Sequence, residues 1–264
     1  GITLEQFHAD LRMGSHENTL AYAAGIMNGE LYVDSIITSP VKYTLDNFDW
    51  NQEVTASPST FQLYLQSLGM VKFLSYAALE LNDPSYLSQA ALFIEDWHHY
   101  EQDAARSASN PKVWYDHASA LRAENLLYFM LVSEKIGFAD DPLREMIRNL
   151  LVDHAVFLSS EDHYTSNHNH GIFQDEALLY IATALHDHSL SSEWALLAKM
   201  RLQEQLDYAF TDEFVHVENS SAYCVGVIEL FSKISDFLQA VNDPYGETLC
   251  DNIYAMIDFY TRMI

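Results

Sequence analysis

The chain has 264 residues and is strongly acidic: 13 Lys and Arg residues stand against 38 Asp and Glu residues, for a formal net charge of −25. This charge argues strongly against general nucleic-acid binding, which needs a basic surface. A composition of 49% hydrophobic and 19% charged residues excludes a disordered chain. The 9 Gly and 6 Pro residues are too few for the turns of an all-β protein. No apolar stretch reaches the roughly 18 residues that a membrane-spanning helix needs.

Amphipathic stretches predict helices along most of the chain. For example, Ser57-Pro58 marks a helix start, and Phe61, Leu65 and Leu68 follow it as an apolar stripe with helical spacing. Residues 29–56, which contain Trp50, are predicted to be irregular. The predicted helices are 4–28, 58–81, 84–105, 116–137, 142–158, 171–187, 192–210, 220–240 and 244–263.

One kind of helix start recurs along the chain. Asn82-Asp83-Pro84, Asp140-Asp141-Pro142 and Asn242-Asp243-Pro244 each precede a long amphipathic stretch, and Ser191-Ser192-Glu193 marks a further start. Asp is a favoured N-cap, and Pro is favoured at the first helical position. The starts recur about every fifty residues, which is the length of two helices and two loops and predicts an all-α fold of stacked antiparallel hairpins. No linker divides the chain, so we expect residues 1–264 to form a single domain.

Two long polar loops stand out among the short connections, at residues 159–171 and 211–222. Long loops of this kind in a compact domain often carry function. Because the loops of a hairpin array alternate between two faces, both loops are expected on the same face, together with the loop that holds Asn110, Trp114 and Asp116.

The first loop contains the unusual run Asn167-His168-Asn169-His170. These side chains could form a cluster of neutral donors that binds a carboxylate, or they could simply serve turn and capping functions. His163, His168 and His170 with Asp162 could also hold a metal, but zinc sites usually add Cys or a regular helical His spacing, so we predict neither a metal nor a cofactor. Nucleophilic Ser-His-Asp chemistry has no Gly-x-Ser-x-Gly signature here.

Four segments resemble a known family. Asn169-His170-Gly171 and the residues after it resemble the Asn-His-Gly helix start in the toroid of heparinase II/III-type polysaccharide lyases and related alginate lyases. Residues 217–223 resemble that family's Glu-Asn-Ser-Pro-x-Tyr-His segment, with Ser221 and Cys224 where Pro and His are common. Residues 114–123 are similar to its Trp-to-Arg helix, and residues 48–51 to the segment that leads into the toroid.

This resemblance implies an all-α (α/α) toroid, an incomplete barrel of antiparallel helical hairpins, and an enzyme that cleaves an acidic polysaccharide by β-elimination at a uronic acid. Asn169 and His170 would neutralise the uronate carboxylate, and Tyr223 would move a proton as base at C5 or as acid at the leaving oxygen. Arg122 would supply positive charge, with a structural ion pair as the alternative. The substrate-binding residues implied are Arg122, His117, Trp114, Asn167 and Asn219.

The family's toroid is followed by a β-sandwich that brings a further catalytic residue. The last predicted helix runs to Ile264, so we expect this chain to be the N-terminal part of a longer protein and to have little activity by itself. The alternatives are a hydrolase that uses two carboxylates, and a non-catalytic carbohydrate-binding or scaffold domain. A periplasmic or secreted location is expected, although Gly1-Ile2-Thr3-Leu4 is no signal peptide, and a cytoplasmic location stays open.

Overall fold

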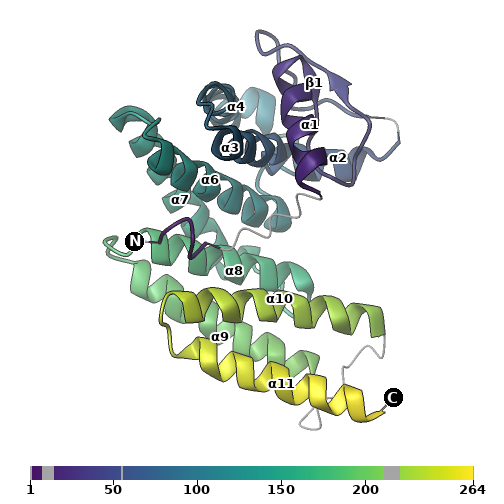
Figure 1. Ribbon diagram of the computed structural model, residues 1–264, viewed down its shortest axis with the longest axis vertical. Helices are drawn as coiled ribbons and strands as arrows, with labels where there is room; N and C mark the ends of the chain where they lie inside the picture. Colours follow the sequence, from purple (N-terminus) through teal and green to yellow (C-terminus); the bar gives the residue numbers. More distant parts are fainter. Residues whose placement is uncertain (1, 8–14, 55, 211–220, 264) are drawn as a thin grey trace. The chain divides into compact units, whose positions relative to one another are not determined.

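The computed structural model describes residues 2–7, 15–54, 56–210 and 221–263. These residues form helices joined by loops, and the only strands among them are two that pair over two residues each (Figure 1). Two compact units are present. We call Ala9–His154 the N-terminal unit and Gly1–His8 with Ala155–Ile264 the C-terminal unit, and each is described by itself.

The N-terminal unit is arranged around α3, which packs against α1, α4 and α6. Its core is rich in aromatic side chains, and Trp50, Phe73, Phe93 and Trp97 are all fully buried. The elements are α1 (His16–Met27), β1 (Glu30–Leu31), β2 (Val41–Lys42), α2 (Pro58–Gln66), α3 (Gly69–Leu81), α4 (Ser85–Gln102), α5 (Ala104–Ser107), α6 (Asp116–Ile136) and most of α7 (Asp141–Ser159).

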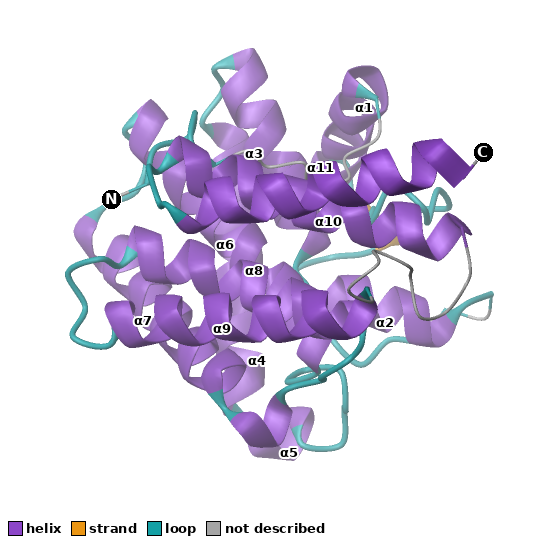
Figure 2. Cartoon of the chain, turned by 90° about the horizontal axis from the view of Figure 1, so that it is seen from below, coloured by secondary structure: helices purple, strands orange, loops and turns teal. Residues whose placement is uncertain are grey.

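The C-terminal unit consists of two helical hairpins, one of α8 with α9 and one of α10 with α11, and α8 also contacts α10 (Figures 1 and 2). The ring of Phe7, near the N-terminus, packs edge-on against Tyr180 of α8, which in turn contacts Phe237 of α10. The elements are the 3-10 helix η1 (Glu161–His163), α8 (Asn169–Ala184), α9 (Ser191–Ala209), α10 (Ser221–Ala240) and α11 (Tyr245–Met263).

The predicted all-α hairpin fold is confirmed, and from residue 116 onward the helices begin and end within three residues of the predicted positions. The recurring Asp residues act as expected at the helix starts. Asp83 accepts a hydrogen bond from the backbone N–H of Ser85 (2.9 Å), and Asp243 accepts one from that of Tyr245 (3.0 Å). These bonds satisfy donors that have no partner within the helix.

The predicted helix 58–81 is wrong at one point, because it is broken between α2 and α3. Leu68 has a left-handed backbone with a φ of 56°. Gly69 then opens α3 so close to the backbone of Val33 that a Cβ would overlap the Val33 carbonyl. The long-range contact with Val33 therefore requires a glycine and a bend at a position where the local apolar stripe is continuous.

Two further predicted helices have different ends. The helix predicted at 84–105 ends at Gln102, because Asp103 is extended and caps α5 by accepting from the N–H of Ala105 (3.1 Å). Of the helix predicted at 4–28, residues 4–7 form a turn instead, residues 8–14 lie outside the described part of the chain, and α1 begins after its N-cap Ser15. No helix among the described residues is long and apolar enough to cross a bilayer.

Candidate active site

The predicted catalytic residues Asn169 and His170 form the first turn of α8, which starts two residues earlier than predicted. His168 is the N-cap: its backbone is extended, and its Nδ1 accepts a hydrogen bond from the backbone N–H of His170 (3.2 Å). The capping function considered for Asn169 or His170 therefore belongs to His168. The side chains of Asn169 and His170 both lie at the positive N-terminal end of a helix, where negative charge is stabilised.

Asn169 has a distinctive environment within this turn. The residue is half-buried, and its Oδ1 is buried without a hydrogen-bond partner among the described residues. A buried amide atom without a partner costs free energy, and rotation of the side chain toward a ligand would remove that cost. The two ends of an amide have nearly the same shape, so a rotation of the group would present its NH₂ donors instead. Asn169 is thus suited to bind a polar ligand.

The residues before this turn have the geometry of a tight loop. Asn167 is exposed and has a left-handed backbone with a φ of 56°, which Asn tolerates better than most residues. The rings of His168 and His170 meet edge to face at 4.4 Å between centroids, whereas His163 stacks on Phe157 at 4.3 Å.

In the described part of the chain, no group of three His, Cys, Asp or Glu side chains is placed to hold a metal ion.

Gly171 completes the Asn-His-Gly motif for a steric reason. A Cβ at this position would lie closer than 3.0 Å to both Gln205 Nε2 and the carbonyl oxygen of Thr165. Such distances essentially never occur between real Cβ atoms and their neighbours. The glycine therefore allows the loop and helix α9 to pack directly against the backbone of the turn that carries Asn169 and His170.

The loop that leads to this turn is also held by Gln174, one helical turn into α8. The Gln174 side chain is fully buried. Its Nε2 donates to the carbonyl of His163 (2.8 Å), and its Oε1 accepts from the backbone N–H of Thr165 (3.0 Å). Both hydrogen-bonding ends of one amide are thus used to fix the loop backbone.

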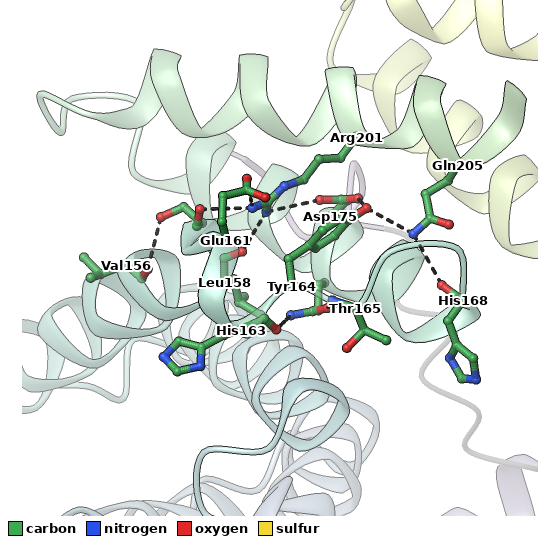
Figure 3. Close-up of polar contacts among 12 residues, drawn as sticks. Val156, Leu158, Glu161, His163, Tyr164, Thr165, His168, Asp175, Arg201 and Gln205 are labelled. Carbon is green, nitrogen blue, oxygen red and sulfur yellow. Dashed lines mark hydrogen bonds and ion pairs between the residues drawn. The ribbon is translucent and has the colours of Figure 1, made fainter. Parts of the chain in front are cut away.

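A buried polar network beneath the loop was not predicted. Tyr164 Oη donates to Asp175 Oδ2 (2.9 Å) and accepts from Gln205 Nε2 (3.0 Å), and the guanidinium of Arg201 lies over the Tyr164 ring (Figure 3). Burial raises the pKa of Asp175 well above its usual range, although Tyr164 and Arg201 oppose the shift. Burial, with the neighbouring Asp175, also raises the pKa of Tyr164, which favours the protonated phenol.

The remaining predicted residues of the second loop lie largely outside the described residues. Tyr223 belongs to the first turn of α10, but its side chain is not among those described, and Asn219 lies outside the described residues. The roles that the family resemblance implies for Tyr223 and Asn219 therefore stay predictions.

Arg122 has a structural environment in the N-terminal unit. Its side chain is fully buried and donates to His154 Nε2 (2.8 Å), the carbonyl of Gln66 (2.6 Å) and Ser119 Oγ (3.3 Å), while its guanidinium carbon lies 4.1 Å from the centroid of Trp97. Burial lowers the pKa of Arg122 to about 9, so the group keeps its charge at neutral pH. These contacts are hydrogen bonds to neutral groups and a cation–π contact within the core, and a role of Arg122 in substrate binding stays a prediction.

Trp114 and His117 are both half-buried, and Trp114 lies beside this cluster. The Nε1 of Trp114 donates to Glu101 Oε1 (3.0 Å), and the Trp114 ring lies 5.1 Å from the Arg122 guanidinium carbon. His117 belongs to the first turn of α6. A role of these two residues in substrate binding stays a prediction.

A family model described as "Heparinase II/III N-terminus" matches residues 24–264, and the chain belongs to this family. The resemblance found in the sequence is thereby confirmed. No sequence among the curated proteins matches the chain.

Solved structures share this fold. A heparinase III structure matches with a TM-score of 0.77 and 16% sequence identity over 95% of this chain. The heparan sulfate lyase HepC from Pedobacter heparinus matches with a TM-score of 0.76 and 17% identity over 94% of this chain. The present chain spans 41% and 39% of those two chains, respectively.

Proposed function

We propose that this chain is the toroid part of a polysaccharide lyase that cleaves a uronic-acid-containing polysaccharide by β-elimination. Membership of the heparinase II/III family supports this function, as does the fold shared with heparan sulfate lyase structures. The observation that carries it is the half-buried Asn169 at the N-terminal end of α8, whose amide oxygen has no partner among the described residues.

The chemistry of β-elimination assigns a role to each residue. The C5 proton of a uronic acid is weakly acidic until the adjacent carboxylate is neutralised, so hydrogen bonds from Asn169 and His170 to that carboxylate would stabilise the enolate-like intermediate. The positive end of α8 would act on the same charge. Tyr223, at the start of α10, would transfer the proton at C5 or at the leaving oxygen.

We also propose that full activity requires a further region outside this chain. The chain spans only about two fifths of the lyase structures that it matches. The acid and base of a lyase must flank the sugar, and loss of one side would remove the alignment that makes proton transfer fast. An uncovered site would also be open to water, which weakens each hydrogen bond to the developing charge.

The test compares this chain with the full-length gene product on a panel of uronic-acid polysaccharides, by following the ultraviolet absorbance of the unsaturated product. We expect turnover by the full-length protein, little turnover by the chain alone, and losses of about a hundredfold or more in Asn169→Ala and Tyr223→Phe variants. Equal rates would show that the toroid carries the whole machinery. If the full-length protein binds an acidic polysaccharide but forms no unsaturated product, the proposed lyase function would be wrong and a carbohydrate-binding function would take its place.

A further inference from the structure

Arg201 and Gln205 lie four residues apart on α9 and therefore share one face of that helix. Both side chains point toward the loop and the first turn of α8 (Figure 3). Only 2% of Arg201 and 4% of Gln205 is exposed, so neither is placed to bind a substrate from solvent. Apart from Arg201 Nε, which is buried without a hydrogen-bond partner, the nitrogen atoms of these two side chains bind groups within the protein, and those groups show which segments each side chain holds.

Gln205 contacts residues on both sides of Asn169 and His170, the two proposed catalytic residues of α8. Its Nε2 donates to Tyr164 Oη (3.0 Å) and, with a longer bond, to the carbonyl of His168 (3.4 Å), the residue directly before Asn169. The same nitrogen fills the space where a Cβ would stand at Gly171. One side-chain amide thus packs against the backbone immediately before and after Asn169 and His170.

Arg201 holds the earlier part of the loop. Its Nη1 donates to the carbonyl of Leu158 (2.9 Å), and its Nη2 donates to the carbonyl of Ser159 (3.1 Å) and to Glu161 Oε1 (2.6 Å). Its Nη1 also lies 3.8 Å from Asp175 Oδ1. The planar guanidinium therefore links the end of α7, the start of η1 and the body of α8 to a single point on α9.

A contribution to folding stability does not by itself explain why these polar side chains are buried together. A buried ionic group often contributes no more to folding than well-packed apolar residues of similar volume, because its desolvation offsets the attraction. Directional hydrogen bonds do, however, restrict a backbone segment to one position. A misplacement of about 1 Å in a catalytic group can cost about a hundredfold in rate.

We infer that Gln205 and Arg201 are positioning residues, which act through the loop and the first turn of α8 to hold Asn169 and His170 against the substrate. This inference rests on the proposed lyase function. Gln205 acts most directly, because its amide touches the turn itself, while Arg201 fixes the loop that precedes it.

The test uses two substitutions of Gln205 and a matched control on the same helix. Gln205→Met has a similar length without a donor, and Gln205→Glu has the same shape with an acceptor in place of the donor. Gln203→Met is the control, because Gln203 donates to Asp207 and accepts from Tyr245, away from the loop. Amide hydrogen exchange of residues 164–172 and the kcat and KM of the full-length protein are measured for each variant.

Both Gln205 variants are expected to speed amide exchange in residues 164–172 by about tenfold or more, and to lower kcat by about ten- to a hundredfold with little change in KM. Gln203→Met should change neither. Unaltered exchange in this segment, or faster exchange with an unchanged kcat, would overturn the inference. If the wild-type protein eliminates no uronate, the lyase function fails, whereas the exchange result still decides whether Gln205 holds the turn.

Discussion

The side-chain amide nitrogen of Gln205 occupies the space that a Cβ would take at Gly171. This contact joins helix α9 to the first turn of α8 without any intervening side chain. It makes the glycine of the Asn-His-Gly motif a packing requirement.

Gly171→Ala should destabilise the protein, because the added methyl group would overlap both Gln205 and the backbone carbonyl of Thr165. The cost of such overpacking is about 1–3 kcal/mol. Urea denaturation measures it. Gly226→Ala is the matched control, since nothing lies within 4 Å of a Cβ at this position inside α10, and there the change should stabilise by about 0.5–1 kcal/mol. Equal effects at both sites would contradict the close packing at Gly171.

Tyr164→Phe should also destabilise the protein, by about 1–3 kcal/mol. The substitution removes the hydroxyl that donates to Asp175 and leaves the buried carboxylate with one hydrogen bond fewer. Tyr208→Phe on α9 removes the hydroxyl of a residue that is 51% exposed and should have almost no effect on the unfolding free energy. If Tyr164→Phe proves as stable as this control, the Tyr164–Asp175 bond contributes nothing to folding.

His168→Ala should weaken the start of α8, because the alanine side chain cannot accept the hydrogen bond from the backbone N–H of His170. Loss of an N-cap costs about 0.5–2 kcal/mol. His168→Asn restores an acceptor that is favoured at N-caps, so its unfolding free energy should lie close to that of the wild type. Thermal denaturation measures the stability of the wild type and of both variants. If His168→Ala is as stable as the wild type, the His168 side chain does not act as a stabilising N-cap.

The contribution of His154 to the stability of the protein should fall in mild acid. Burial, with the charge of Arg122, lowers the pKa of His154 well below its usual value of about 6.5. As the pH falls through that usual value, the unfolded chain therefore binds a proton that the folded chain does not. The stability contributed by neutral His154 is present above about pH 6.5 and is lost below it, at up to about 1.4 kcal/mol per pH unit.

Urea denaturation at about pH 7.5 and about pH 5.5, on either side of the ordinary His pKa, measures this effect. His154→Gln keeps an acceptor for Arg122 Nε but cannot titrate, so its loss of stability across this range should be smaller than that of the wild type. The same pH dependence in both proteins would show that His154 is not the group responsible.

Local sequence signals were sufficient to predict most helices. A favoured cap such as Asp83 or Asp243 acts on backbone groups only two residues away, and an amphipathic stripe repeats within a single helix. For the same reason Asn169 and His170 could be predicted to lie together at a helix start. The break at Leu68 could not be predicted, because it depends on the contact of Gly69 with Val33 from another part of the chain.

The burial of polar residues was decided by tertiary structure. Arg122 has the same local pattern whether it faces a substrate or His154, and only packing shows which group it contacts. Tyr164, Asp175, Arg201 and Gln205 come from three separate segments, and their charged or polar character alone favours an exposed position. They are buried because each segment supplies hydrogen-bond partners for the others, and that compensation exists only once the segments have packed together.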